Sequence, residues 1–165
     1  MDRILSEARE LLDSVTPLKR DCGRFCGAAC CRPMEGEETG MILFPGEEEE
    51  YEGRAGWKLK ETERGILLIC DGKCRREERP LACRLFPLIP AAGKNGIRAV
   101  VDQRAVTVCP LARQGMRAMN PAFEDAVRRA GELLAADSRY AKILREAEKE
   151  SEDLRALRKE MGFDV

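Results

Sequence analysis

The stretch C-G-R-F-C-G-A-A-C-C, residues 22–31, holds four of the chain's eight cysteines within ten residues. Cys30 and Cys31 are adjacent, and only glycine and alanine separate them from Cys26. The remaining cysteines follow at longer intervals, as Cys70, Cys74, Cys83 and Cys109. Four neighbouring free thiols would be an oxidation liability without a purpose. The stretch therefore predicts one wall of a thiol-based site that is built from distant segments of the chain.

The 165-residue chain is long enough for one compact domain with a hydrophobic core, so its size alone requires no disulfides. The net charge is -1, which gives no general attraction to nucleic acid or to acidic membranes. No apolar run approaches the roughly 20 residues that span a bilayer. The first fifteen residues resemble an amphipathic helix and lack the features of a signal peptide. We therefore expect a cytoplasmic protein with no membrane segment.

In a reducing compartment, many cysteines indicate metal or redox chemistry more often than disulfides. The chain has no histidine, which excludes mixed Cys/His zinc sites, Rieske-type clusters and Cys–His nucleophile pairs. The spacing matches neither the paired C-x2-C knuckles of a zinc ribbon nor the run of a bacterial ferredoxin, although Cys109-Pro110 matches the ferredoxin ending. The expected cofactor is zinc or iron held by thiolates, with an iron–sulfur cluster as the close alternative.

We expect an α+β fold, in which a small cysteine-rich metal-binding domain with short strands is flanked by an N-terminal helix and C-terminal helices. The predicted domains are 1–110 and a helical extension, 111–165, that packs on the first part or on a partner. A helix is expected over 2–16, an exposed acidic turn over 47–52, and irregular structure over 75–90 because of its three prolines. The expected strands are 41–44, 65–70 and two within 97–109.

After Pro110, apolar residues recur at helical spacing. A short helix is expected over 111–119, and another begins at Pro121, which suits the first position of a helix. The apolar stripe of that helix is Phe123, Val127, Ala130 and Leu134. A last helix from Ser138 carries Tyr140, Leu144, Ala147, Ser151, Leu154 and Met161. Such stripes are typical of core or partner-packing faces.

Three motifs taken together resemble the YkgJ-type cysteine-cluster family, which is described as zinc- or iron-chelating. They are the cluster at 22–31, the strand and turn G-I-L-L-I-C-D-G-K-C at 65–74, and R-P-L-A-C-R-L-F-P at 79–87. In the cluster, the gaps are three residues where the family more usually has two. The resemblance covers roughly residues 20–110. It implies a metal-binding domain whose ligands are the clustered cysteines together with Cys70, Cys74 and Cys83, and it implies no particular reaction.

Two arginines in the third motif flank Cys83. We expect Arg79 and Arg84 to donate hydrogen bonds to ligand sulfur or to offset the negative charge of a thiolate site. The alternative is a surface ion pair with Glu77 or Glu78.

Three functions fit these patterns. The first is a metal-binding protein with a structural, storage-like or electron-carrying role. The second is a metalloenzyme with an open coordination position, in which Asp71, Glu77 or Glu78 would serve as the base. The third is a metal-stabilised interaction module that docks a protein partner or a second copy through the helix at 138–161. Basic residues that alternate with acids and a 5% aromatic content argue against nucleic-acid binding.

Overall fold

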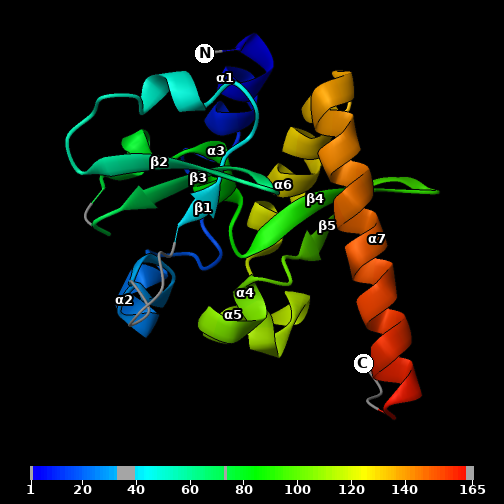
Figure 1. Ribbon diagram of the computed structural model, residues 1–165. Helices are drawn as coiled ribbons and strands as arrows, with labels where there is room; N and C mark the ends of the chain where they lie inside the picture. Colours follow the sequence, from blue (N-terminus) through cyan, green and yellow to red (C-terminus); the bar gives the residue numbers. More distant parts are fainter. Residues whose placement is uncertain (1, 33–39, 73, 163–165) are drawn as a thin grey trace.

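The computed structural model describes residues 2–32, 40–72 and 74–162 of the chain. It confirms an α+β fold, with two small antiparallel sheets surrounded by helices (Figure 1). The N-terminal half contains α1 (Arg3–Glu10), α2 (Gly23–Cys26), η1 (Ala29–Cys31), β1 (Met41–Ile42), η2 (Glu48–Glu50), β2 (Trp57–Thr62), β3 (Gly65–Cys70), η3 (Arg76–Glu78) and α3 (Leu81–Leu85). The C-terminal half contains β4 (Leu88–Gly93), β5 (Gly96–Val101), α4 (Ala105–Val108), α5 (Pro110–Gln114), η4 (Met116–Ala118), α6 (Pro121–Leu134) and α7 (Ser138–Glu160). No helix within the described ranges is both long and apolar enough to cross a bilayer.

The predicted strand at 65–70 is the central strand β3 of the first sheet, which has the order β1-β3-β2. The register pairs Thr62 with Gly65 at the tight turn and Trp57 with Cys70 at the far end. The first sheet therefore ends at Cys70, which begins the turn to Cys74. The second sheet is the β4–β5 hairpin, whose strands pair from Leu88 opposite Val101 to the turn between Gly93 and Gly96.

The segment 75–90 was expected to be irregular because of its prolines, and this expectation was wrong. Two of its three prolines lie where the missing N–H costs little. Pro80 precedes the first residue of α3, and Pro90 lies in β4, which is an edge strand of its two-stranded sheet.

The expectation of a second strand within 97–109 is also wrong, because residues 105–108 form the helix α4. Asp102 directs this change. Its backbone N–H donates to the Pro87 carbonyl at 3.0 Å, and its carboxylate accepts the backbone N–H of Arg104 at 2.9 Å. The chain therefore turns into a helix directly after β5.

The predicted apolar stripe of α6 is buried, and the α7 stripe is buried from Tyr140 to Ser151, whereas its last member, Met161, is exposed. α6 packs against β5 and α1, and α7 runs along β4 (Figure 1). Side chains of the α6 stripe are fully inaccessible, and the core they join extends from Leu5 in α1 to Leu144 in α7. The last turns of α7 project past the hairpin, where Leu157 and Met161 are exposed. The expected partner for this helix stays a prediction.

The N-terminal helix is shorter than the expected 2–16, because α1 ends at Glu10. After α1 the chain bends. The guanidinium of Arg76 in η3 donates hydrogen bonds to the backbone carbonyl oxygens of Leu12 and Val15 at 2.5 Å and of Asp13 at 3.0 Å. These carbonyl groups are therefore bonded to Arg76 instead of to a continuing helix, and the bend is tied to η3.

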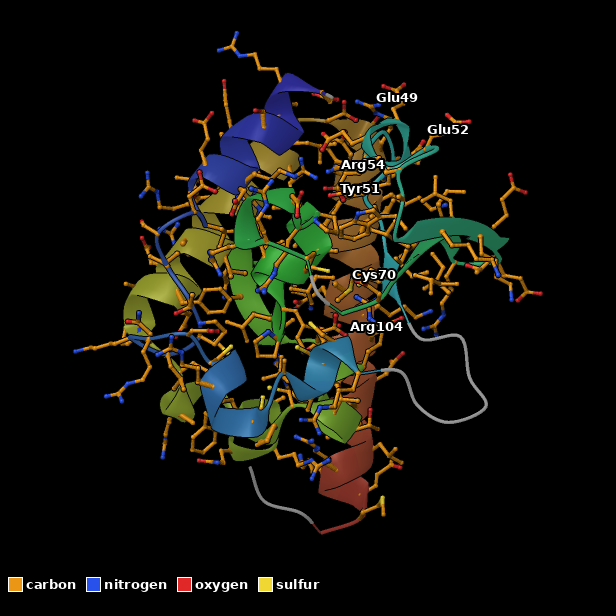
Figure 2. The ribbon with its side chains drawn as sticks, turned by 90° about the vertical axis from the view of Figure 1, so that its left-hand side faces the viewer. Glu49, Tyr51, Glu52, Arg54, Cys70 and Arg104 are labelled. Carbon is orange, nitrogen blue, oxygen red and sulfur yellow. The ribbon has the colours of Figure 1, made fainter. Side chains whose placement is uncertain are left out.

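The acidic run 47–52 was expected to be fully solvated, and its first residue corrects that expectation. Glu47 is fully buried, and Arg9 donates to its carboxylate at 2.9 Å. Tyr51 is buried as well, whereas Glu49 and Glu52 point outward (Figure 2). Because the Glu47 carboxylate also accepts the Leu81 N–H at 2.7 Å, it fixes the start of α3, the helix that carries Cys83.

Candidate metal centre

The eight cysteines come from separate elements and gather in one part of the molecule. Six of them line a cavity of about 70 Å³ between the 22–31 stretch, α3 and the end of α4: Cys22, Cys26, Cys30, Cys31, Cys83 and Cys109. Of the other two, Cys70 is the last residue of β3 (Figure 2), and Cys74 lies close to Cys31 and Cys83. None of the eight forms a disulfide; Cys109 is buried, and the other seven are partly or fully exposed.

The 22–31 stretch folds back on itself between its two halves. Gly27 and Ala28 both have left-handed backbone conformations, with φ of 63° and 54°. A left-handed conformation is natural for glycine but strained for alanine. The Ala28 N–H donates to the Gly23 carbonyl at 2.8 Å, which closes the turn. This reversal brings the cysteines of α2 and those of η1 to the same cavity.

Cys30 and Cys31 are in contact, with their Sγ atoms 3.8 Å apart. A hydrogen bond from the Cys30 thiol lowers the pKa of Cys31 to about 7, and the Arg79 guanidinium also favours its thiolate. The same hydrogen bond and burial raise the pKa of Cys30. One of the two thiols is therefore deprotonated readily, and the other is deprotonated with difficulty unless a cation lies nearby.

The turn from Cys70 to Cys74 repeats this arrangement. A hydrogen bond from Cys70 lowers the pKa of Cys74 to about 6, with a further contribution from Arg79. Gly72 in this turn lies directly against the 22–31 stretch, because a Cβ at its position would be 2.5 Å from the Cys31 carbonyl oxygen. Only glycine allows this close approach, and its φ of 76° also favours glycine.

The two arginines proposed beside the site have different surroundings. The Arg79 guanidinium interacts with Cys74 and lies near Cys31 and Cys83, and its buried Nε has no hydrogen-bond partner among the described residues. Arg84 lines the cavity, but its guanidinium is occupied elsewhere: it donates to the Arg79 and Glu77 carbonyl oxygens at 3.0 Å, and it pairs with the carboxylate of Asp13. Arg79 is therefore the cation placed to stabilise thiolates.

The donor chemistry of this region fits a soft metal, whereas its present geometry does not form a coordination sphere. Within residues 2–32, 40–72 and 74–162, no three His, Cys, Asp or Glu side chains are arranged to hold a metal ion. The free thiols, the Arg79 cation and the unpartnered Nε nevertheless match what a thiolate-bound metal requires around it. Metal binding would require the thiol groups to rotate toward one another.

The acids that the enzyme hypothesis requires are placed as follows. Glu78 accepts hydrogen bonds from the Arg75 backbone at 3.0 Å and forms ion pairs with Arg75 and Arg54. Glu77 is exposed and lies 3.6 Å from the Arg75 guanidinium. Asp71 is exposed in the turn that begins after Cys70. None of the three lines the cysteine cavity.

Sequence reasoning missed Arg76, which lines the same cavity and ties the 12–15 bend to η3. No local signal marks it, since its partners are backbone carbonyl groups more than 60 residues away. A larger cavity of about 530 Å³ was missed too. It lies between α7, β4 and the β1–β3 end of the first sheet, and it is lined by the buried Asp102 and by its ion-pair partner Arg104, which is exposed.

Comparison of the chain with protein-family models, with curated proteins and with solved structures finds no match.

Proposed function

We propose that this chain is a metal-binding protein that holds zinc or iron through cysteine thiolates. The observation that carries the proposal is the gathering of eight unlinked thiols from separate elements around a small cavity, next to the Arg79 guanidinium. Buried free thiols usually act as small hydrophobic groups, yet seven of these eight retain solvent access. The side chains are therefore available to bind a ligand.

The ligand set consists of the eight cysteines, and Arg79 offsets part of their negative charge. Cys31 and Cys74 are the thiols most easily deprotonated, because each accepts a hydrogen bond from a neighbouring thiol and lies near Arg79. A bound zinc ion would link the separate segments, and its binding free energy would stabilise the folded state. An iron–sulfur cluster would instead supply electron transfer. Unlinked thiols in this number suit the reducing cytoplasm.

The test is metal analysis of protein purified anaerobically, with optical spectra, on the wild type and on Cys30→Ala and Cys31→Ala. We expect bound zinc or iron in the wild type and a lower content in both variants. Absorption near 400 nm from thiolate-to-iron charge transfer would identify iron, and its absence with bound zinc would identify zinc. Ser14→Ala changes an exposed residue outside the cavity and should leave the metal content unchanged. A wild type without metal, or variants with unchanged content, would contradict the proposal.

A further inference from the structure

We propose that the outer edge of β5 is a self-association surface, on which a second copy of the chain adds its own β5 in the antiparallel direction. The two β4–β5 hairpins would then form one continuous sheet. This surface is independent of the proposed metal site, because it is made by the backbone of the hairpin. It also differs from the partner surface expected on the helix at 138–161.

The backbone groups that β5 leaves free follow from the register of the hairpin. The Asp102 N–H donates to the Pro87 carbonyl at 3.0 Å. Along an antiparallel ladder, hydrogen-bonded pairs alternate with pairs that are not bonded to each other. Every second residue of β5 is therefore bonded to β4, and the residues between them direct their N–H and C=O groups to the free edge. These outward residues are Ile97, Ala99 and Val101.

The outward groups of β5 face water. α6 and α7 pack against β5, and the α6 contact is close, because a Cβ at Gly131 would lie 2.6 Å from the Cγ2 of Ile97. Within the described parts of the chain, one outward group has a partner: the Val101 carbonyl accepts the Gln103 amide at 3.2 Å. Ile97, Ala99 and Val101 are all partly exposed. Since backbone groups without a partner are rarely buried, this edge is open to solvent.

The other edge strands of the two sheets each carry a feature that hinders pairing. In β4, Pro90 lies opposite Ala99, so this position has no N–H to offer at the free edge. β2 carries the exposed residues Lys58 and Lys60, and lysine is a side chain by which natural proteins protect sheet edges. β1 has only two residues. β5, with the sequence G-I-R-A-V-V, has neither proline nor lysine. An unprotected edge in a fold that protects its other edges indicates an interface.

The β5 sequence is complementary to itself. A two-fold axis at Ala99 places Val101 of the partner subunit opposite Ile97, so that β-branched side chains pair on both sides of a small residue. Arg98 would lie opposite Val100 of the partner subunit, and its charge is already paired with Glu148 at 2.8 Å. No like charges therefore oppose each other. Both copies of α6 would cover one face of the joined sheet and both copies of α7 the other, which is a common layered architecture.

Sedimentation velocity of the full chain in reducing buffer, from about 5 µM to about 500 µM, measures the association. We expect a weak monomer–dimer equilibrium, because strand pairing adds hydrogen bonds but buries little apolar area. Ala99→Pro should raise the Kd of the dimer at least about tenfold, because both N–H donors at the two-fold axis are lost. The Ala99 N–H points away from β4, so this proline removes no hydrogen bond of the hairpin.

Glu61→Pro is the matched control, and it should leave the Kd unchanged. Glu61 is an exposed residue of the edge strand β2 and lies opposite Ile66, whose carbonyl accepts the Leu43 N–H. By the same alternation, its N–H points away from β3. Proline is thus placed on an equivalent edge position of the other sheet. Circular dichroism checks the folding of both variants.

Amide hydrogen exchange of the wild type, followed by NMR, gives a second measurement that needs no variant. The amides of Ile97, Ala99 and Val101 should exchange more slowly at high protein concentration. Those of Arg98 and Val100 should not change, because they are bonded within the hairpin in either state. A monomer over the whole concentration range would overturn the proposal. A dimer that Ala99→Pro leaves intact, or one that does not protect the outward amides, would also overturn it and would place the interface elsewhere.

Discussion

The buried carboxylate of Glu47 gives the sharpest stability prediction, through the substitution Glu47→Gln. One oxygen of this carboxylate accepts the Leu81 N–H at 2.7 Å and the Arg9 Nη2 at 2.9 Å, and the other accepts the Phe44 N–H at 3.0 Å. Glutamine has the same shape but only one acceptor. Whichever way its amide is turned, an NH2 group faces at least one N–H donor that has no access to water.

The cost follows from these contacts. Leaving one buried N–H without an acceptor costs about 1–3 kcal/mol, and replacing the charge-assisted bond from Arg9 by a neutral one costs about 1 kcal/mol more. The loss of the full ion pair is smaller than for an isolated buried pair, because Arg9 also binds Glu50 at 2.7 Å. We therefore expect Glu47→Gln to lower the free energy of unfolding by about 2–4 kcal/mol.

Urea denaturation of metal-free, reduced protein, followed by circular dichroism, measures this change. With a slope of about 2 kcal/mol/M, the midpoint should fall by roughly 1–2 M. Glu49→Gln is the matched control, because Glu49 is exposed in the same acidic run and its substitution should change stability by less than about 0.5 kcal/mol. Equal midpoints for the two variants would refute the reasoning that the buried network stabilises the fold.

Three further predictions concern other contacts. Gly131→Ala should destabilise by about 1–3 kcal/mol in thermal unfolding, although alanine normally favours a helix, because the new Cβ would lie 2.4 Å from the Pro90 ring; a rise in Tm would contradict this packing. Tyr140→Phe should cost about 1 kcal/mol in urea, because the Asp2 carboxylate and the Pro45 carbonyl lose the one hydroxyl proton that they share, and no change would mean that water replaces it. Arg79→Met should raise the pKa of Cys74 above its value of about 6, because the thiolate loses a neighbouring cation. Alkylation of the metal-free protein across pH 5–9, followed by peptide mass spectrometry, should therefore show the Cys74 midpoint moving to higher pH, and an unmoved midpoint would remove Arg79 from the site.

Several elements could be predicted because their signals are local. The run G-I-L-L-I-C is continuous, apolar and bounded by glycines, and it is the central strand β3. The stripe from Phe123 to Leu134 recurs at helical spacing and is buried. Asn120 and Asp137 cap α6 and α7 through their side chains, as expected for residues that precede a helix.

Other features could not be predicted because their causes lie far away in the sequence. Glu47 is the first of four consecutive glutamates, and nothing local distinguishes it from its solvated neighbours. Its burial depends on Arg9, 38 residues earlier. The β-branched run at 106–108 has the composition of a strand, yet the preceding Asp102 turns the chain into α4. The grouping of the cysteines likewise depends on the contact between Gly72 and Cys31, which no spacing within 22–31 reveals.

The order of the cysteines along the chain has a consequence for biosynthesis. The four thiols of the 22–31 stretch are made first, whereas Cys83 and Cys109, which line the same cavity, are made much later, and Cys109 lies beyond the β4–β5 hairpin. During translation, the first four thiols are therefore present before the elements that close the cavity around them. For that interval they are the thiols of the nascent chain that are most open to oxidants.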